Sequence, residues 1–226
     1  MDEAGGGPGA AVLLYWLPLG AGGHLVRLNG RLYEAFTARR QHRAARDLYH
    51  SALEVHLGSD RFVIEMAPVW ALADPDRGVV CRGPVGSPAL GGLAAFRYEV
   101  RRWHMGVIPD VAEAVGGPRL MSRDPARARR LLALVPQVPL LTWGRDEAGT
   151  GEMWNSNSLI TWLLVRSGFD VAGVRPPPHG RAPGWQAGLI VAARGQPPAR
   201  KTMALRGRRP AGGEASRDYG RRSRAG

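Results

Sequence analysis

Alternating apolar and polar residues predict β-strands in the first half of the chain. Residues 50–57 (HSALEVHL) place leucine and valine on one face of a strand and histidine, alanine and glutamate on the other. A turn follows at 58–60 (GSD), and 61–66 (RFVIEM) returns as a second strand. The pair Asn29-Gly30 predicts a tight hairpin turn within 24–34. The same kind of pattern predicts further strands at 11–17, at 93–103 and in the apolar run 186–193.

Helix signals dominate the second half of the chain. Asp110 is expected to cap a short helix over 110–115, and the pair Asp124-Pro125 predicts a helix over 125–135. The stretch 154–168 (WNSNSLITWLLVRSG) starts polar, continues apolar and closes at a glycine, which predicts a third helix. Because strands come first and helices later, the pattern indicates an α+β fold.

We interpret the chain as one domain between two flexible ends. Its 226 residues are enough for one good-sized core. Residues 1–10 are glycine-rich and expected to be loose, and the domain is expected to span 11–198. The arginine-rich tail 199–226 is expected to be disordered. It holds nine basic and two acidic residues, and so carries more than half of the net charge of +12.

The third helix is where the sequence predicts chemistry. Apolar residues cover most of its circumference, so it is expected to be central and buried. Asn155 is a sound N-cap, which puts Ser156 in the first turn. Helix N-termini present unpaired N–H groups and a partial positive charge, which stabilise an anion or an oxyanion. Ser156 is therefore either a candidate nucleophile or only a helix-capping hydroxyl beside Asn155.

Two motifs resemble the papain-like peptidases of the NlpC type. That family carries a catalytic cysteine in a motif Asp-Cys-Ser-Gly-Leu-Val at the start of a buried helix, and residues 155–160 (NSNSLI) follow this pattern position by position. The family's histidine begins a strand, which a turn and Val-Ile-Glu-Ala follow, and here 50–55 (HSALEV) and 62–67 (FVIEMA) look similar. The histidine precedes the helix, an order that resembles the circularly permuted branch, which includes lecithin retinol acyltransferase-like proteins.

The resemblance implies a papain-like α+β fold, with an antiparallel sheet packed on a central helix that starts near Ser156. It implies His50 as the general base, Ser156 at the nucleophile position and Glu65 as the group that orients the imidazole. The oxyanion site and the cleft would then involve Asn155, Asn157 and Trp154. The implied activity is hydrolysis or transfer of an acyl group on an amide, ester or thioester. It needs no cofactor and acts on a small-molecule, lipid or peptide substrate.

The serine departs from the family pattern, and the third group depends on strand register. A thiol ionises near a pKa of ~8.5, whereas a hydroxyl must pass its proton to histidine during attack.

Pairing of Leu57 with Phe62 would place Glu65 opposite Glu54, on the face of His50, and a loop one residue shorter would place it on the other face. The alternative is therefore a catalytically inactive pseudoenzyme that acts as a binding or scaffold module.

Composition adds a third alternative, an arginine-rich protein that binds nucleic acid or another acidic surface through its tail. The same arginine excess, beside abundant Ala, Gly and Pro, also indicates a coding bias. Cys81 is the single cysteine, so no intramolecular disulfide or cysteine zinc site can form, and no metal is expected. No apolar run approaches the ~20 residues of a membrane helix. Asp2 and Glu3 stand where a secretory signal carries positive charge, so we expect a cytoplasmic protein without a membrane span.

Overall fold

The structure is a computed structural model that describes residues 9–19, 46–69 and 77–195, with the single positions 39, 42 and 44. Three of the sequence predictions lie wholly or largely outside these residues. They are the loose N-terminal segment up to residue 8, the hairpin at 24–34 and the tail 199–226.

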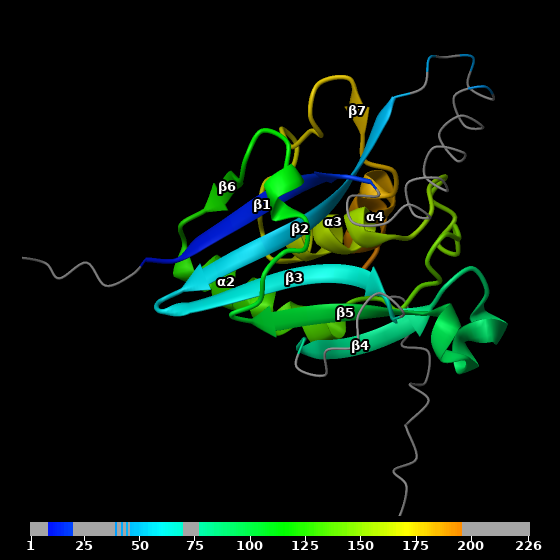
Figure 1. The fold of residues 1–226 in the computed structure, drawn as a ribbon, viewed down its shortest axis with the longest axis horizontal. Helices are drawn as coiled ribbons and strands as arrows, with labels where there is room; N and C mark the ends of the chain where they lie inside the picture. Colours follow the sequence, from blue (N-terminus) through cyan, green and yellow to red (C-terminus); the bar gives the residue numbers. More distant parts are fainter. Residues whose placement is uncertain are drawn as a thin grey trace, which may run out of the picture.

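A twisted sheet forms the centre of the described chain (Figure 1). Its strands are β1 (Ala11–Pro18), β2 (Asp47–Leu57), β3 (Asp60–Pro68), β4 (Val79–Pro84), β5 (Arg97–His104), β6 (Arg119–Ser122) and β7 (Gly180–Arg181). The order is β4-β5-β3-β2-β1-β6 with antiparallel pairing, and β7 pairs in parallel with the first residues of β2. The predicted strands at 11–17, 50–57 and 61–66 are confirmed.

Three α-helices accompany the sheet in the described residues, and they confirm the α+β class. They are α2 (Pro125–Leu134), α3 (Ser156–Arg166) and α4 (Trp185–Ala193). The Asp124 side chain accepts a hydrogen bond from the N–H of Ala126 at 2.8 Å, as the predicted cap requires. Short 3₁₀ turns complete the fold, namely η2 (Pro88–Gly92), η3 (Ala94–Phe96), η4 (Val111–Glu113) and η5 (Val135–Gln137). None of the described helices is long and apolar enough to span a bilayer.

Three of the predicted elements differ from the structure. The run 186–193 is a helix, because a continuous apolar run does not separate a buried strand from a buried helix. The strand expected at 93–103 begins only at Arg97, because η2 and η3 occupy the residues before it. The helix expected at 110–115 is the single turn η4, and Asp110 adopts a left-handed conformation (φ 59°) without capping it.

Side-chain alternation gives the sheet two faces with different covers. On one, which we call the helix face, Leu53 and Ile64 pack with residues of α2 and α3. On the other, which we call the far face, Leu17, Ala52 and Val63 pack with Ile108 of the segment after β5. Figure 1 shows the helices gathered behind the sheet, with α3 between the strands and α4. The first turn of α3 therefore meets only the helix face.

The close contact between α3 and α4 depends on Gly188. A Cβ atom at this position would stand 2.3 Å from the carbonyl oxygen of Ser158 and 2.8 Å from Cβ of Thr161. We therefore expect Gly188→Ala to lower the free energy of unfolding by ~1–3 kcal/mol, as overpacking does, in urea denaturation. The control is Gly92→Ala, where a Cβ meets nothing within 4 Å. Equal stability of the two variants would contradict the packing described here.

Candidate functional site

The polar first turn of α3 is a capping box. The side-chain oxygen of Asn155 accepts hydrogen bonds from the N–H groups of Asn157 at 2.9 Å and Ser158 at 3.2 Å. In return, the Ser158 hydroxyl accepts a hydrogen bond from the N–H of Asn155 at 3.1 Å. The prediction that Asn155 caps the helix is confirmed. Two of the N–H groups at this helix end are therefore already occupied and are not free for an oxyanion.

Asn157 joins the helix to strand β2 and to the segment before α4. Its side-chain amide donates to the carbonyl oxygens of Tyr49 and Pro183, both at 2.9 Å. Its side-chain oxygen accepts from the hydroxyl of Ser51 at 2.8 Å. Both N–H bonds of the amide are used, and the residue is only 2% exposed. The donors that were expected to stabilise an oxyanion therefore hold protein carbonyls instead.

The start of α4 is built onto the same cluster. The hydroxyl of Ser158 donates to the carbonyl oxygen of Gly184 at 2.8 Å. Gly184 has a φ of 85°, and a Cβ there would lie 2.4 Å from the side-chain oxygen of Asn155. The carboxylate of Glu152 accepts the N–H groups of Gly184 at 2.9 Å and Gln186 at 3.1 Å, which satisfies the free end of α4.

Ser156 and Trp154, the two other predicted site residues of this segment, are both buried. Ser156 is 6% exposed, and within the described ranges its hydroxyl forms no hydrogen bond. Trp154 is 2% exposed and belongs to the hydrophobic core, so it does not border a cleft. The hydroxyl of Ser156 thus differs from its neighbours, whose polar groups are all engaged.

His50, the expected general base, points away from α3. The β1–β2 register pairs Trp16 with Ser51 and Leu17 with His50. Trp16 and Ser51 lie on the helix face, whereas Leu17 lies on the far face. Because neighbouring residues of a strand alternate between faces, the sheet separates His50 from Ser156. The structure therefore does not bring the predicted pair together.

The surroundings of His50 agree with a role in packing. Burial lowers the pKa of the imidazole to about 4, so the ring is neutral at pH 7. A neutral imidazole can accept a proton only from a group within hydrogen-bonding reach. Among the described residues the ring has no hydrogen-bond or ion-pair partner.

Glu65 lies on the far face with His50, but its carboxylate has another partner. The β2–β3 hairpin pairs Leu57 with Asp60 instead of the expected Phe62, a register shift of two residues. Because side chains alternate with a period of two, this shift leaves Glu65 on the face that was expected. The carboxylate accepts a hydrogen bond from Nη1 of Arg101 at 2.6 Å. Glu65 is thus one half of a buried ion pair rather than the group that orients an imidazole.

A buried charged cluster, which the sequence pattern did not predict, surrounds this pair. Arg101 also lies 3.3 Å from Glu99, whose carboxylate accepts two further hydrogen bonds from Arg82 at 3.1 and 3.2 Å. Arg77 approaches the same carboxylate at 3.8 Å. Glu99 and Arg101 are 2% and 1% exposed. The sequence does carry a sign of this cluster, because Glu99 and Arg101 stand at alternate positions of β5 and so share one face. Buried charges need partners on the same face.

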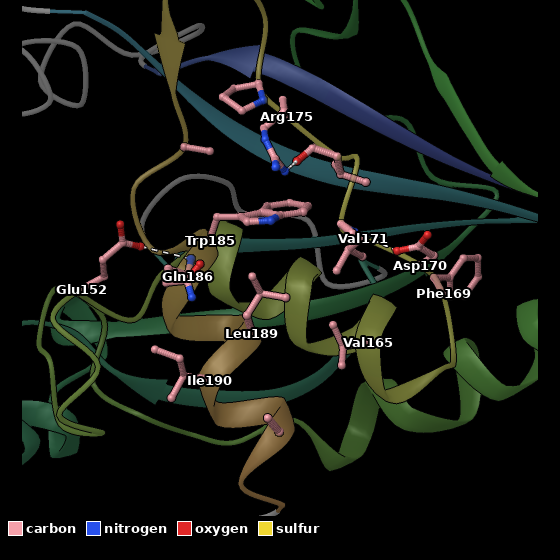
Figure 2. A pocket seen from close by; sticks show the side chains of 15 residues that line it. Glu152, Val165, Phe169, Asp170, Val171, Arg175, Trp185, Gln186, Leu189 and Ile190 are labelled. Atoms are coloured by element: carbon pink, nitrogen blue, oxygen red, sulfur yellow. Dashed lines mark hydrogen bonds between the residues drawn. The ribbon is translucent and has the colours of Figure 1, made fainter.

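A groove opens between α4 and the segment that follows α3 (Figure 2). Its volume of about 890 Å³ lies within the range of roughly 300–1,000 Å³ for ligand sites. Its walls are mostly apolar, from Val165, Phe169, Val171, Val174, Leu189 and Ile190. Glu152, Asp170, Arg175 and Gln186 supply its polar groups. The sequence pattern did not predict this groove, because residues 186–193, which form one wall, were expected to be a strand.

The remaining reactive groups point to no second centre. Burial raises the pKa of the Cys81 thiol to about 12, so the thiol stays protonated at neutral pH. In the part of the chain that the structure describes, no three His, Cys, Asp or Glu side chains converge as metal ligands.

The hydrogen bonds of Asn157 predict a large difference between two neighbouring substitutions. Asn157→Ala leaves a buried carbonyl and the hydroxyl of Ser51 without partners, so we expect a loss of ~2–4 kcal/mol of unfolding free energy. Ser156→Ala removes a hydroxyl without a hydrogen bond and should cost less than ~1 kcal/mol. Chemical denaturation of both variants tests this, and similar losses would contradict the network described above.

The lowered pKa of His50 predicts a pH dependence of stability. The unfolded chain takes up a proton near pH 6.5, whereas the folded protein does so only near pH 4. The contribution of neutral His50 is therefore complete above pH 6.5 and is lost as the pH falls towards 4. His50→Gln should flatten this part of the curve in thermal melts, whereas His104→Gln, on the surface, should leave it in place. An unchanged slope in His50→Gln would show that the imidazole titrates normally.

The NlpC-type resemblance remains a prediction from two short motifs. Comparison of the chain with protein-family models, with curated proteins and with solved structures gave no match.

Proposed function

We propose that this chain acts as a binding or scaffold module in which the polar first turn of α3 is structural. The papain-like fold of the permuted NlpC type, in which the nucleophile and the histidine share one cleft, stays a prediction from two motifs. The observation that carries this proposal is the separation of Ser156 and His50 by the sheet. A serine nucleophile needs a base within hydrogen-bonding reach, because its hydroxyl does not ionise near neutral pH.

The first turn of α3 supports the same conclusion. In acyl transfer the oxyanion requires free donors at the reacting centre. Here the N–H groups of Asn157 and Ser158 hold Asn155, and the side-chain amide of Asn157 holds two carbonyls. The polar residues that resemble a catalytic motif therefore serve to fix α3 against β2 and α4.

The groove beside α4 is the surface that such a module offers. Apolar walls with a few polar groups at the margin are typical of binding sites. From α3 the groove takes only Val165, and its other walls come mainly from α4 and the segment after α3 (Figure 2). Binding there would not involve the first turn of α3, in keeping with its structural role.

One observation favours the second candidate, an acyl hydrolase or acyltransferase. Ser156 is the one residue of the first turn whose hydroxyl has no hydrogen bond within the described residues. Under this alternative a base must come from a residue other than His50. The third candidate, nucleic-acid binding through the tail, concerns residues outside the described part and stays a prediction.

A fluorophosphonate probe separates the proposed function from the second candidate. We expect no covalent labelling of the full chain, and the same result for Ser156→Ala. Labelling of the wild type that disappears in Ser156→Ala would overturn the proposal and establish a serine enzyme. His50→Gln then tells whether the imidazole takes part, because loss of labelling in this variant would contradict the separation described here.

A further inference from the structure

The 3₁₀ turns η2 and η3 connect β4 to β5 and form an apolar projection, which we call the tip and define as residues 85–96. Its sequence is VGSPALGGLAAF, in which Ser87 carries the only polar side chain. Neither turn contributes a buried residue, and Leu90, Leu93 and Phe96 are 40%, 58% and 40% exposed. Figure 1 shows the two turns in green beyond the ends of both strands, at the right of the view. Exposed apolar patches of this kind are typical of surfaces that contact a membrane or another protein.

Much of the tip's backbone is paired. The N–H groups of its three large apolar residues donate to carbonyl oxygens three residues earlier, at 3.2, 2.9 and 3.0 Å. The carbonyl oxygens of Gly91 and Gly92 accept hydrogen bonds from the guanidinium group of Arg97, both at 2.6 Å. Unpaired backbone groups are costly next to hydrocarbon, because lipid tails offer no hydrogen-bond partners. The tip thus presents its apolar side chains on a backbone that is compatible with the edge of a bilayer.

The base of the tip is positively charged. Arg97 follows the tip directly, and Arg145 reaches it from a distant part of the chain, where its Nε donates to the carbonyl oxygen of Gly86 at 2.7 Å. Both guanidinium groups bond to uncharged carbonyl oxygens, so each keeps its positive charge. The tip itself contains no acidic residue, and the carboxylate of the nearby Asp146 is bonded to N–H groups of its own loop. An anionic surface would therefore meet positive charge at the base of the tip.

These features favour a lipid bilayer over a protein partner. A protein interface of standard size buries about 800 Å² on each side, with an apolar centre inside a polar rim. The tip instead projects from the end of the sheet, with its large apolar side chains on two short turns (Figure 1). Insertion into a bilayer surface needs only a few apolar side chains, with basic residues at the level of the lipid headgroups.

We propose that the tip is a membrane-binding element that inserts Leu90, Leu93 and Phe96 into the surface of an anionic bilayer. Arg97 and Arg145 then lie among the lipid headgroups. The chain binds the membrane peripherally, at the end of the sheet where β4 is joined to β5. Because the tip shares no residue with the groove or with the first turn of α3, this inference goes beyond the proposed function and does not depend on it.

Co-sedimentation of the full chain with vesicles tests the proposal. We expect binding to vesicles of phosphatidylcholine and phosphatidylserine in equal parts, and weaker binding to phosphatidylcholine alone. Leu93→Ser should weaken the binding to the anionic vesicles by at least ~10-fold, because one leucine is no longer removed from water. The matched control is Val107→Ser, which removes a side chain of similar exposure (56%) beyond the other end of β5 and should bind as the wild type does.

A second measurement reports on insertion itself. It is needed because the nine basic residues of the tail 199–226 attract anionic vesicles without insertion. An environment-sensitive dye on Leu93→Cys, in a chain that also carries Cys81→Ser, should shift its emission to shorter wavelength when the anionic vesicles are added. The same dye on Val107→Cys should show no shift.

Several results would overturn the proposal. One is a wild type that stays in the supernatant at every lipid concentration. Another is binding that Leu93→Ser leaves unchanged, without a dye response at position 93, because the charge of the tail would then account for it. Equal binding to phosphatidylcholine alone would overturn the role of the arginines. A dye shift at position 93 that rises with protein concentration in the absence of lipid would show that a second copy covers the tip. Labelling of Ser156 bears only on the proposed function.

Discussion

The hydrogen bond between Ser51 and Asn157 is the contact on which the rest of the site depends. It fixes the first turn of α3 against one face of β2, together with the bond from the same amide to the carbonyl of Tyr49. Strand residues alternate, so once Ser51 faces the helix, His50 must face away from it. A register different by one residue would have turned His50 towards α3 and Ser51 away from it.

The same cluster determines where α4 begins. Ser158 and Asn155 surround Gly184, and Glu152 accepts the first N–H groups of the helix. Asn155 and Ser158 are therefore each used twice, once to start α3 and once to hold the segment that leads into α4. Buried polar networks of this kind are stabilising only when every member is satisfied. This explains why a segment that resembles a catalytic motif carries so little free hydrogen-bonding capacity.

The two faces of the sheet divide the predicted triad. Ser156 stands on the helix face, whereas His50 and Glu65 share the far face, where Arg101 holds the carboxylate. The far face thus keeps two of the three predicted groups but uses them in packing and ion pairing. The described core leaves Leu189 and Ile190 of α4 half-buried at the groove.

Local patterns were sufficient for much of this fold. The alternating residues of 50–57 and 61–66 and the caps at Asp124 and Asn155 act over a few residues, and the structure confirms all of them. The alternation also indicates that His50 does not face the helix. A buried helix packs on the apolar face of a strand, and His50 stood on the polar one.

The tertiary structure alone decided three matters: the helical state of 186–193, the partners of the charges on β5, and the side of β2 that α3 covers. Each depends on contacts between residues far apart in the chain. Small side chains let α4 lie close to α3. This packing makes a helix more favourable than a strand for residues 186–193, and the local sequence does not show that α3 is the neighbour.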